Sequence, residues 1–153
     1  MQILDACCGS KMFWYDKDNS LTTYMDNREI DTTLRDGRKL VIKPDIIADF
    51  TNMPFDDGTF DLVVFDPPHL INAGANSWLA QKYGVLPKNW QDSLRKGFSE
   101  CFRVLSPHGI LIFKWNTAQI PFNDVVKLAP EPPLFGDRRS NTRWTVFCKG
   151  ARE

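Results

Sequence analysis

The stretch FDLVVFDPPHL, Phe60–Leu70, joins a strand pattern to an abrupt stop. Phe60 to Phe65 form a short, nearly continuous apolar run, which is typical of a strand buried on both faces of a parallel sheet. The run ends at an acid, two prolines and a histidine. Proline has no backbone N–H and a fixed φ, so strand pairing stops there. The sequence therefore predicts a buried strand whose end carries chemically active groups.

Four other segments share this short, apolar character, and we expect them to be strands of the same sheet. They are residues 2–6 (QILDA), 20–25 (SLTTYM), 44–49 (PDIIAD) and 109–115 (GILIFKW). Residues 89–105 lie between the fourth and fifth strands and show apolar side chains at spacings of three and four, as in an amphipathic helix. Asn89 is a suitable N-cap, and Ser106 to Gly109 end the helix. This is a β-α-β unit.

The other connections are weaker. Residues 10–18 permit only a short helix, and residues 27–44 are polar and glycine-broken, which favours a loop or a short hairpin. Residues 130–150 hold two alternating segments around a polar turn and predict a terminal antiparallel hairpin. We therefore expect residues 1–153 to form a single doubly wound α/β domain. Ligands bind beyond the carboxyl ends of the strands in such sheets.

Composition excludes several classes of protein. The 153 residues are 42% hydrophobic, and no apolar run approaches the ~18 residues that span a bilayer. No signal-peptide pattern is present, so we expect a cytoplasmic protein without a membrane partner. The cysteines at positions 7, 8, 101 and 148 form no CxxC pair, and we expect no metal.

The net charge of zero hides an uneven distribution. Residues 1–75 carry seven Lys/Arg and 13 Asp/Glu, whereas residues 76–153 carry 12 and six. The basic half is either a set of solvated surface charges or a surface that meets phosphates.

Acids follow four successive predicted strands, at Asp5, Asp26, Asp49 and Asp66. An acid in the place of Asp26 can accept the hydroxyl hydrogens of a ribose, as in dinucleotide folds. Asp49 can take an exocyclic amine while the Phe50 N–H donates to a ring nitrogen, a pair that would recognise adenine. Each acid can equally form a turn or a cap. The first loop, Asp5 to Ser10, has one glycine and no phosphate-binding fingerprint.

Several motifs occur together, in order, over residues 2–115. The segment ADFTNMPFDDGTFDLVVF resembles the adenine-binding acid, LPF…FD loop and fourth strand of class I S-adenosylmethionine-dependent methyltransferases. ECFRVLSPHGILIF resembles their RVLKPGG joint, with His108 in place of a glycine, and LDACCGS occupies the position of their glycine-rich first motif. The resemblance implies a Rossmann-like, mostly parallel seven-stranded sheet with a C-terminal antiparallel hairpin.

The resemblance also implies a cofactor site. S-adenosyl-L-methionine would be bound, with S-adenosyl-L-homocysteine as the product. The segment from Asp5 to Gly9, which includes Ala6 and Cys7, would line the methionine moiety. Asp26 would hold the ribose, Asp49 and Phe50 would hold the adenine, and Asp66 would lie close to the reacting methyl group. The single glycine and the missing N-terminal helix depart from the family, so part of the pocket would be open, or would be covered by Met12, Phe13 and Trp14 or by a second subunit.

The DPPH motif, Asp66–His69, resembles the (D/N)PP(Y/F/W) motif of amino-methyltransferases, which act mostly on exocyclic amines of bases and sometimes on glutamine amides. An aromatic amine is a poor nucleophile because its lone pair is delocalised. Asp66 and the Pro67 carbonyl can each accept one amine hydrogen, while Pro67 and Pro68 hold that carbonyl rigidly. His69 can stack on the base and can titrate. A base inside a duplex must flip out to reach such a pocket.

The acceptor side is less defined. Residues 70–88 are rich in Gly and Asn and lie where a substrate lid is expected; Trp78 and Tyr83 can pack there or stack a base. Lys114, Trp115 and Asn116 end the fifth strand and are candidate substrate contacts. Arg138, Arg139 and Arg143 form either a phosphate-binding loop or a solvated hairpin tip.

The sequence leaves three functions open. The first is N-methylation of a base amine in DNA or RNA; the chain also resembles small methyltransferases carried by phages of Gram-positive bacteria. The second is methylation of a small molecule or a protein amide. The third is a cofactor-binding module without catalysis. A homodimer is compatible with each of these functions.

Overall fold

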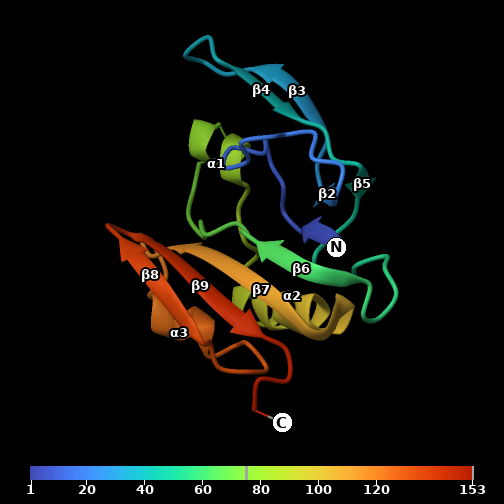
Figure 1. The fold of residues 1–153 in the computed structure, drawn as a ribbon. Coiled ribbons are helices and arrows are strands. Elements are labelled where there is room, and N and C mark those ends of the chain that lie inside the picture. Colours follow the sequence, from blue (N-terminus) through green and yellow to red (C-terminus); the bar gives the residue numbers. More distant parts are fainter. Residues whose placement is uncertain (75, 153) are drawn as a thin grey trace.

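The computed structural model of the protein describes residues 1–74 and 76–152, and its largest element is a seven-stranded sheet of order β5-β2-β1-β6-β7-β9-β8 (Figure 1). The parallel strands are β1 (Ile3–Asp5), β2 (Thr22–Asp26), β5 (Ile46–Ile47), β6 (Phe60–Phe65) and β7 (Leu105–Asn116). Strand β9 (Thr142–Cys148) runs antiparallel to β7, and β8 (Phe135–Arg139) antiparallel to β9. The predicted mostly parallel sheet and terminal hairpin are confirmed.

The strand order reverses between β1 and β6. The chain passes from β1 outward through β2 to β5, and then returns to β6 on the other side of β1. This reversal is the topological switch point of a doubly wound sheet, where the loops after the strands separate and leave a crevice. The DPPH motif follows β6, so the topology places it at this crevice.

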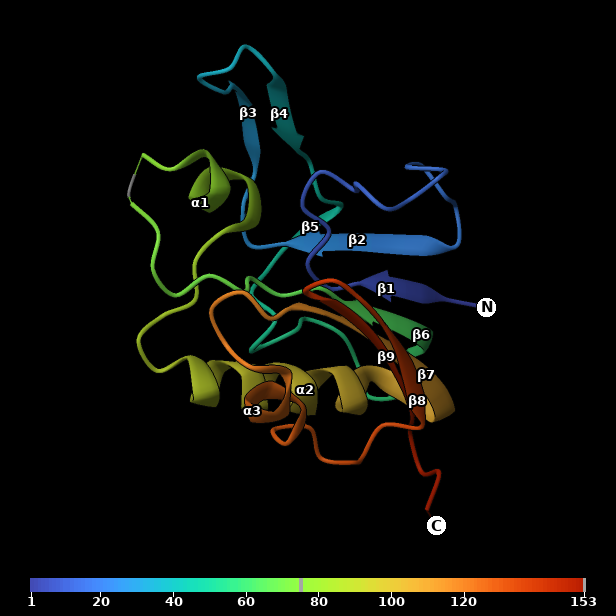
Figure 2. The same ribbon diagram turned by 90° about the vertical axis from the view of Figure 1, so that its left-hand side faces the viewer.

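Helices α2 (Trp90–Val104) and α3 (Phe122–Val126) lie on one face of the sheet, as Figure 2 shows. The apolar stripe of α2 forms this core: Leu94, Phe98 and Cys101 are fully buried against Phe65 and Phe113 of the sheet. The predicted helix is confirmed to within one residue at each end. These rings therefore form a densely packed layer on this face of the sheet.

The chain between β2 and β5 folds as a separate antiparallel hairpin of β3 (Ile30–Thr33) and β4 (Lys39–Ile42), which projects from the body in Figure 1. Its small cluster of Leu34, Leu40 and Ile42 is distinct from the main core. Helix α1 (Trp78–Tyr83) lies in the predicted lid; Ala75, in the same segment, falls outside the described residues.

Three local predictions were wrong. Residues 10–18 form turns rather than a short helix, because Lys11 has a φ of 57° and the Trp14 indole turns inward to Asp5. Residues 106–109, which were predicted to end the helix and turn the chain into the strand, already belong to β7: the helix ends at Val104, a pairing shift between Phe60 and Leu62 accommodates them, and His108 takes a φ of 62°. Strand β5 keeps only two residues of the predicted 44–49.

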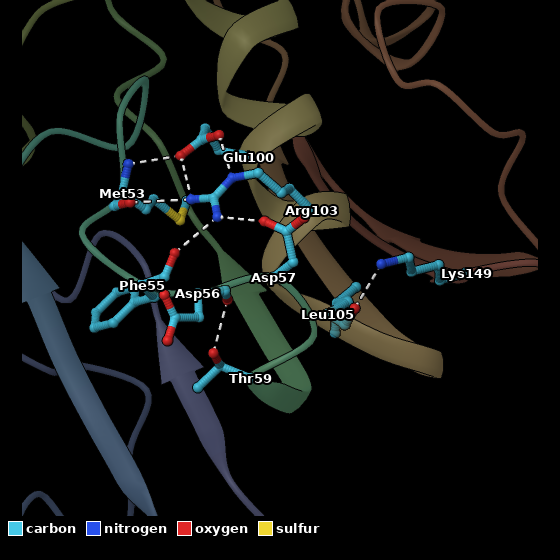
Figure 3. A network of polar contacts seen from close by, with 9 residues as sticks. All are labelled: Met53, Phe55, Asp56, Asp57, Thr59, Glu100, Arg103, Leu105 and Lys149. Atoms are coloured by element: carbon cyan, nitrogen blue, oxygen red, sulfur yellow. Dashed lines mark hydrogen bonds and ion pairs between the residues drawn. The ribbon is translucent and has the colours of Figure 1, made fainter.

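A polar network fixes the loop between β5 and β6 to α2 (Figure 3). The Arg103 guanidinium donates to Glu100 Oε1 at 2.7 Å, to the Phe55 carbonyl at 2.7 Å and to the Met53 carbonyl at 3.0 Å, and it pairs with Asp57. Glu100 also accepts from the Met53 N–H at 2.7 Å. Met53 and Phe55 follow Phe50 in the chain, so this network anchors the segment directly after Phe50.

Candidate functional site

A cavity of about 340 Å³, which we call the strand-end cavity, lies beyond the carboxyl ends of β1, β2 and β6. Its volume lies within the range of small-molecule sites. Most of the predicted site residues contribute to its lining: Ala6, Cys7, Gly9, Asp26, Phe50, Asp66, Pro67, Pro68, His69 and Lys114. Residues 70–88, the predicted lid, supply Lys82, Tyr83, Gly84 and Val85. The fold therefore gathers the candidate cofactor and acceptor residues in one place.

Asp5 lies beneath this cavity and does not line it. Its side chain is fully buried and accepts hydrogen bonds from Trp14 Nε1 at 2.7 Å and from the Cys7 N–H at 3.3 Å. Burial raises the pKa of Asp5 to about 7, the two hydrogen bonds oppose that rise, and the charges of Asp66 and Asp26 add to it. Asp5 thus organises the first loop from below.

Asp26 is buried at the end of β2 and joins two loops. Its Oδ2 accepts from the Gly9 N–H at 2.9 Å, and its Oδ1 accepts from the Arg28 N–H at 3.0 Å and from Arg28 Nε at 3.4 Å. Gly9 has a φ of 50°, a left-handed conformation that glycine adopts without strain. A carboxylate has about four acceptor sites, so about one remains free for a ligand hydroxyl.

Ala48 and Phe50 line the cavity, whereas Asp49 between them is exposed and points elsewhere. Asp49 Oδ1 accepts from the Thr51 N–H at 2.8 Å and from Thr51 Oγ1 at 2.7 Å, which is turn chemistry. Phe50 packs edge-on against Phe65, with ring centroids 5.3 Å apart. Phe50 is therefore the residue of this segment placed to touch a ligand.

The acid of the DPPH motif is already paired on one side. Lys114 Nζ lies 3.1 Å from Asp66 Oδ2 and is also near the Phe13 and Trp144 rings, 5.5 and 5.7 Å from their centroids. Burial raises the pKa of Asp66, and the Lys114 ammonium partly offsets that rise. Lys114 therefore holds Asp66 in a fixed orientation.

His69 lies between two other rings. Its centroid is 5.4 Å from Tyr83 of the lid and 6.3 Å from Trp115 of β7. Burial and the positive charge of Lys114 lower the pKa of His69. The lowered pKa favours the neutral ring, which has an unprotonated nitrogen.

Two predicted substrate contacts lie away from the cavity. Trp115 is 1% exposed, packs in the core, and donates from Nε1 to the Ile120 carbonyl at 3.0 Å. Asn116 Oδ1 accepts from the Ala118 N–H at 2.9 Å and shapes the turn after β7. Strand alternation explains the position of Trp115, because Lys114 faces the side of the sheet opposite to it, whereas Asn116 is at the end of β7 and is taken up by the turn.

Two side chains that the sequence did not reveal hold the segment of residues 70–88 in place. Arg28 Nη1 donates to the Gln81 carbonyl of α1 at 2.8 Å, and Gln119 Oε1 accepts from the Ile71 and Asn72 N–H groups at 2.6 and 3.0 Å. Gly84 ends α1 so close to the DPPH motif that a Cβ there would lie 3.3 Å from Pro68 Cγ. These contacts join residues far apart in sequence, so no local pattern predicts them.

The described residues, 1–74 and 76–152, contain no helix long and apolar enough to cross a membrane. Within the same residues no group of three or more His, Cys, Asp or Glu side chains is arranged to bind a metal ion. All four cysteines are free thiols, and burial raises the pKa of Cys8 to about 12.

Comparison with known proteins places the fold. No known protein family and no curated protein matches the sequence. The PH0226 protein of Pyrococcus horikoshii is similar in structure, with a TM-score of 0.65 at 16% identity, over 97% of this chain and 81% of that one. A S-adenosylmethionine-dependent methyltransferase of Leishmania major has a TM-score of 0.55 at 15% identity, over 95% and 64% of the two chains.

The TehB-like S-adenosylmethionine-dependent methyltransferase of Corynebacterium glutamicum has a TM-score of 0.55 at 16% identity, over 97% of this chain and 79% of that one. The fold is that of class I methyltransferases. At these identities the likeness is one of fold, so the reaction has to be argued from the strand-end cavity.

Proposed function

We propose that this chain is an S-adenosylmethionine-dependent methyltransferase that N-methylates the exocyclic amine of a base in DNA or RNA. One observation carries the proposal: the Asp66–His69 motif and the loop from Ala6 to Gly9 line the same cavity at the switch point of the sheet. A cofactor and an amine acceptor can therefore meet there. The fold of the solved methyltransferases supports the reaction class.

The donor set of the cavity fits this cofactor, which, when bound, supplies a methyl group activated on a sulfonium. Ala6, Cys7 and Gly9 would border its methionine moiety, and the free acceptor site of Asp26 would take a ribose hydroxyl. Phe50 would pack on the adenine. The carboxylates of Asp26 and Asp66 favour a cation over a neutral ligand, although Lys114 offsets part of that charge.

The acceptor residues have separate roles. Asp66 Oδ1, which no protein group uses in the described structure, would accept one amine hydrogen, while Oδ2 stays with Lys114. The Pro67 carbonyl would accept the second hydrogen. The nitrogen that gains a methyl group must lose a proton, and the neutral His69 ring can take it. The rate would come from positioning and local hydrogen bonds.

The remaining sequence-based expectations stay predictions: a small-molecule or amide acceptor, a module without catalysis, a homodimer, a cytoplasmic location and a phage origin. The three functions separate in one assay. Purified protein with radiolabelled cofactor is offered single-stranded and duplex DNA, RNA, nucleosides and a nucleic-acid-free cell extract, alongside calorimetric titration of the cofactor.

We expect micromolar or tighter cofactor binding and label in nucleic acid. Label found only in the extract would show that the acceptor is a small molecule or a protein amide and not a base. Cofactor binding without any label would favour a module without catalysis. No cofactor binding would overturn the proposal.

A further inference from the structure

An exposed tryptophan marks a surface beside the strand-end cavity. Trp78, at the start of α1, is 44% exposed and lies outside the main core. Two cations from different elements flank its ring: the Arg38 guanidinium at 5.4 Å from the ring centroid and Lys82 Nζ at 5.9 Å. An exposed ring between cations is a surface on which a planar anionic ligand can stack.

This surface is continuous with the cavity. Lys82 Nζ also lies 5.2 Å from the Tyr83 ring, and Tyr83 lies 5.4 Å from the His69 ring of the DPPH motif. Lys82 and Tyr83 both line the cavity. The order from inside to outside is therefore His69, Tyr83, Lys82, Trp78 and Arg38, which we call the aromatic-cation track.

The β3–β4 hairpin supplies the outer end of the track. Its own cluster of Leu34, Leu40 and Ile42 makes it a separate projecting unit, and the bend at residues 34–38 presents Arg38 to α1. The hairpin and α1 lie side by side beyond the carboxyl ends of the strands in Figures 1 and 2. Asp36 Oδ2 accepts from Arg38 Nε at 2.7 Å and forms an ion pair with Arg38 Nη2, which orients the guanidinium, and Arg38 Nη1 makes no hydrogen bond within the described residues.

The spacing of the two lid rings suits a polynucleotide. Trp78 and Tyr83 are five residues apart on α1, so they are separated by about 7.5 Å along the helix axis and by about 140° around it. Lys82 lies near both rings, so a ligand that touched Tyr83 and Trp78 would pass Lys82 along the surface of α1, as a strand of more than one nucleotide can. A duplex would hold neighbouring bases in their stack and away from the ring.

We infer that the aromatic-cation track binds single-stranded nucleic acid: the target base enters the cavity at His69, a neighbouring base stacks on Trp78, and Arg38 and Lys82 contact the phosphates. This inference rests on the proposed function and deepens it from a base amine to a single-stranded polynucleotide. Positively charged side chains alternating with rings are the usual means of binding single strands without sequence preference.

The test measures binding apart from methylation. A fluorescent 12-nucleotide single strand of mixed sequence and its duplex are titrated with the wild type and with Trp78→Ala. Stacking of one base contributes about 1–3 kcal/mol, so Trp78→Ala is expected to weaken single-strand binding about 5- to 100-fold. Trp78→Phe, which keeps a ring, is expected to restore most of it. Tyr15→Ala removes a fully exposed ring outside the track and serves as the matched control.

Arg38→Gln gives a second readout, which is the salt dependence of single-strand binding. If Arg38 neutralises one phosphate, the variant should neutralise one fewer. Its plot of log affinity against log salt concentration should then have a slope that is shallower by about 0.7. Arg95→Gln, at an exposed position on α2 away from the track, is the matched control. Equal binding of the single strand by wild type and Trp78→Ala, or tighter binding of the duplex, overturns the inference.

Unchanged calorimetric affinity for the cofactor shows that the variants are folded. If methylation of oligonucleotides does not respond to Trp78→Ala, the inference fails while the proposed function stands. If the strand binds through Trp78 but no nucleic acid is methylated, the proposed function fails and the binding surface remains.

Discussion

The face of the sheet under α2 and the mouth of the strand-end cavity are built by different means. Under α2, large rings such as Phe65, Phe98 and Phe113 are fully buried against one another. The mouth is held by single polar contacts, including Arg28 to the Gln81 carbonyl and Lys114 to Asp66. Substitutions in the packed face should therefore reduce stability, whereas substitutions at the mouth should change binding and turnover.

The largest expected effect comes from Asp5, which lies between the two regions. Its pKa of about 7 exceeds the unfolded value of 3.8, so between about pH 4 and pH 7 the folded state binds more protons than the unfolded state. The free energy of unfolding should then fall with rising pH, by about 2–4 kcal/mol across this window from this group. Urea titrations at half-unit intervals of pH measure the slope.

Asp5→Asn should flatten that slope, whatever its absolute stability, because the amide does not titrate. Asp18→Asn, at a largely exposed acid, is the matched control and should leave the slope unchanged. An equally steep fall in Asp5→Asn would show that another group carries the pH dependence.

Arg103→Ala tests the packed region through its polar network. The change removes bonds to Glu100 and to the Met53 and Phe55 carbonyls and leaves the half-buried Glu100 without its cation. We expect a loss of about 2–3 kcal/mol in the free energy of unfolding, discounted for the partial exposure of Arg103. Urea unfolding followed by tryptophan fluorescence measures it. Arg95→Ala, exposed on the same helix, should change stability by less than about 0.5 kcal/mol.

Gly97→Ala couples the two regions. A Cβ at position 97 would lie 2.6 Å from Phe50 Cδ2 and 2.7 Å from Phe65 Cζ. Phe65 is fully buried, so Phe50 has to move toward the cavity. We expect a loss of about 1–2 kcal/mol in stability together with a several-fold weaker cofactor affinity by calorimetry. Ser99→Ala on the same helix is the control; a stability loss with unchanged cofactor affinity would separate Phe50 from the cofactor site.

Arg28→Ala should have the smallest effect and should be confined to the mouth. The change removes the side-chain hydrogen bond from Arg28 to Asp26 and the hydrogen bond from Arg28 to the Gln81 carbonyl of α1. One such bond contributes about 1 kcal/mol, so the KM for the acceptor should rise about three- to tenfold with kcat nearly unchanged. Steady-state methylation kinetics measure both. A fall in kcat without a change in KM would show that Arg28 acts on the reacting groups and not on the lid.

The packed region was the part that the sequence predicted well. Continuous apolar runs such as Phe60–Phe65, and the spacing of three and four along residues 90–104, depend on burial, which is a local property of the sequence. The failures had non-local causes. Residues 10–18 are shaped by the hydrogen bond from Trp14 to the buried Asp5. Residues 106–109 stay within β7 because Leu105 and Ile110, on either side of them, pair with β6.

The mouth was predicted in part. The positions of Asp26, Phe50 and Asp66 at strand ends follow from topology, and these residues do line the cavity. Their partners could not be predicted, because Lys114 and Arg28 reach them across the fold. Asp49 lies at the same edge but turns to Thr51, so a strand-end position alone does not establish contact with a ligand.

Substitution of Asp66 tests the proposed reaction most directly. Turnover of a single-stranded oligonucleotide is measured for the wild type, Asp66→Asn and Asp66→Ala, with cofactor affinity determined by calorimetry on the same preparations. Asn keeps an acceptor oxygen and Ala does not, so Asp66→Asn should retain a measurable rate. Asp66→Ala should lose at least about 100-fold in kcat with cofactor affinity within a few-fold of the wild type. Turnover of Asp66→Ala at the wild-type rate would contradict the account, because no acceptor for the amine hydrogen would then be needed at this position.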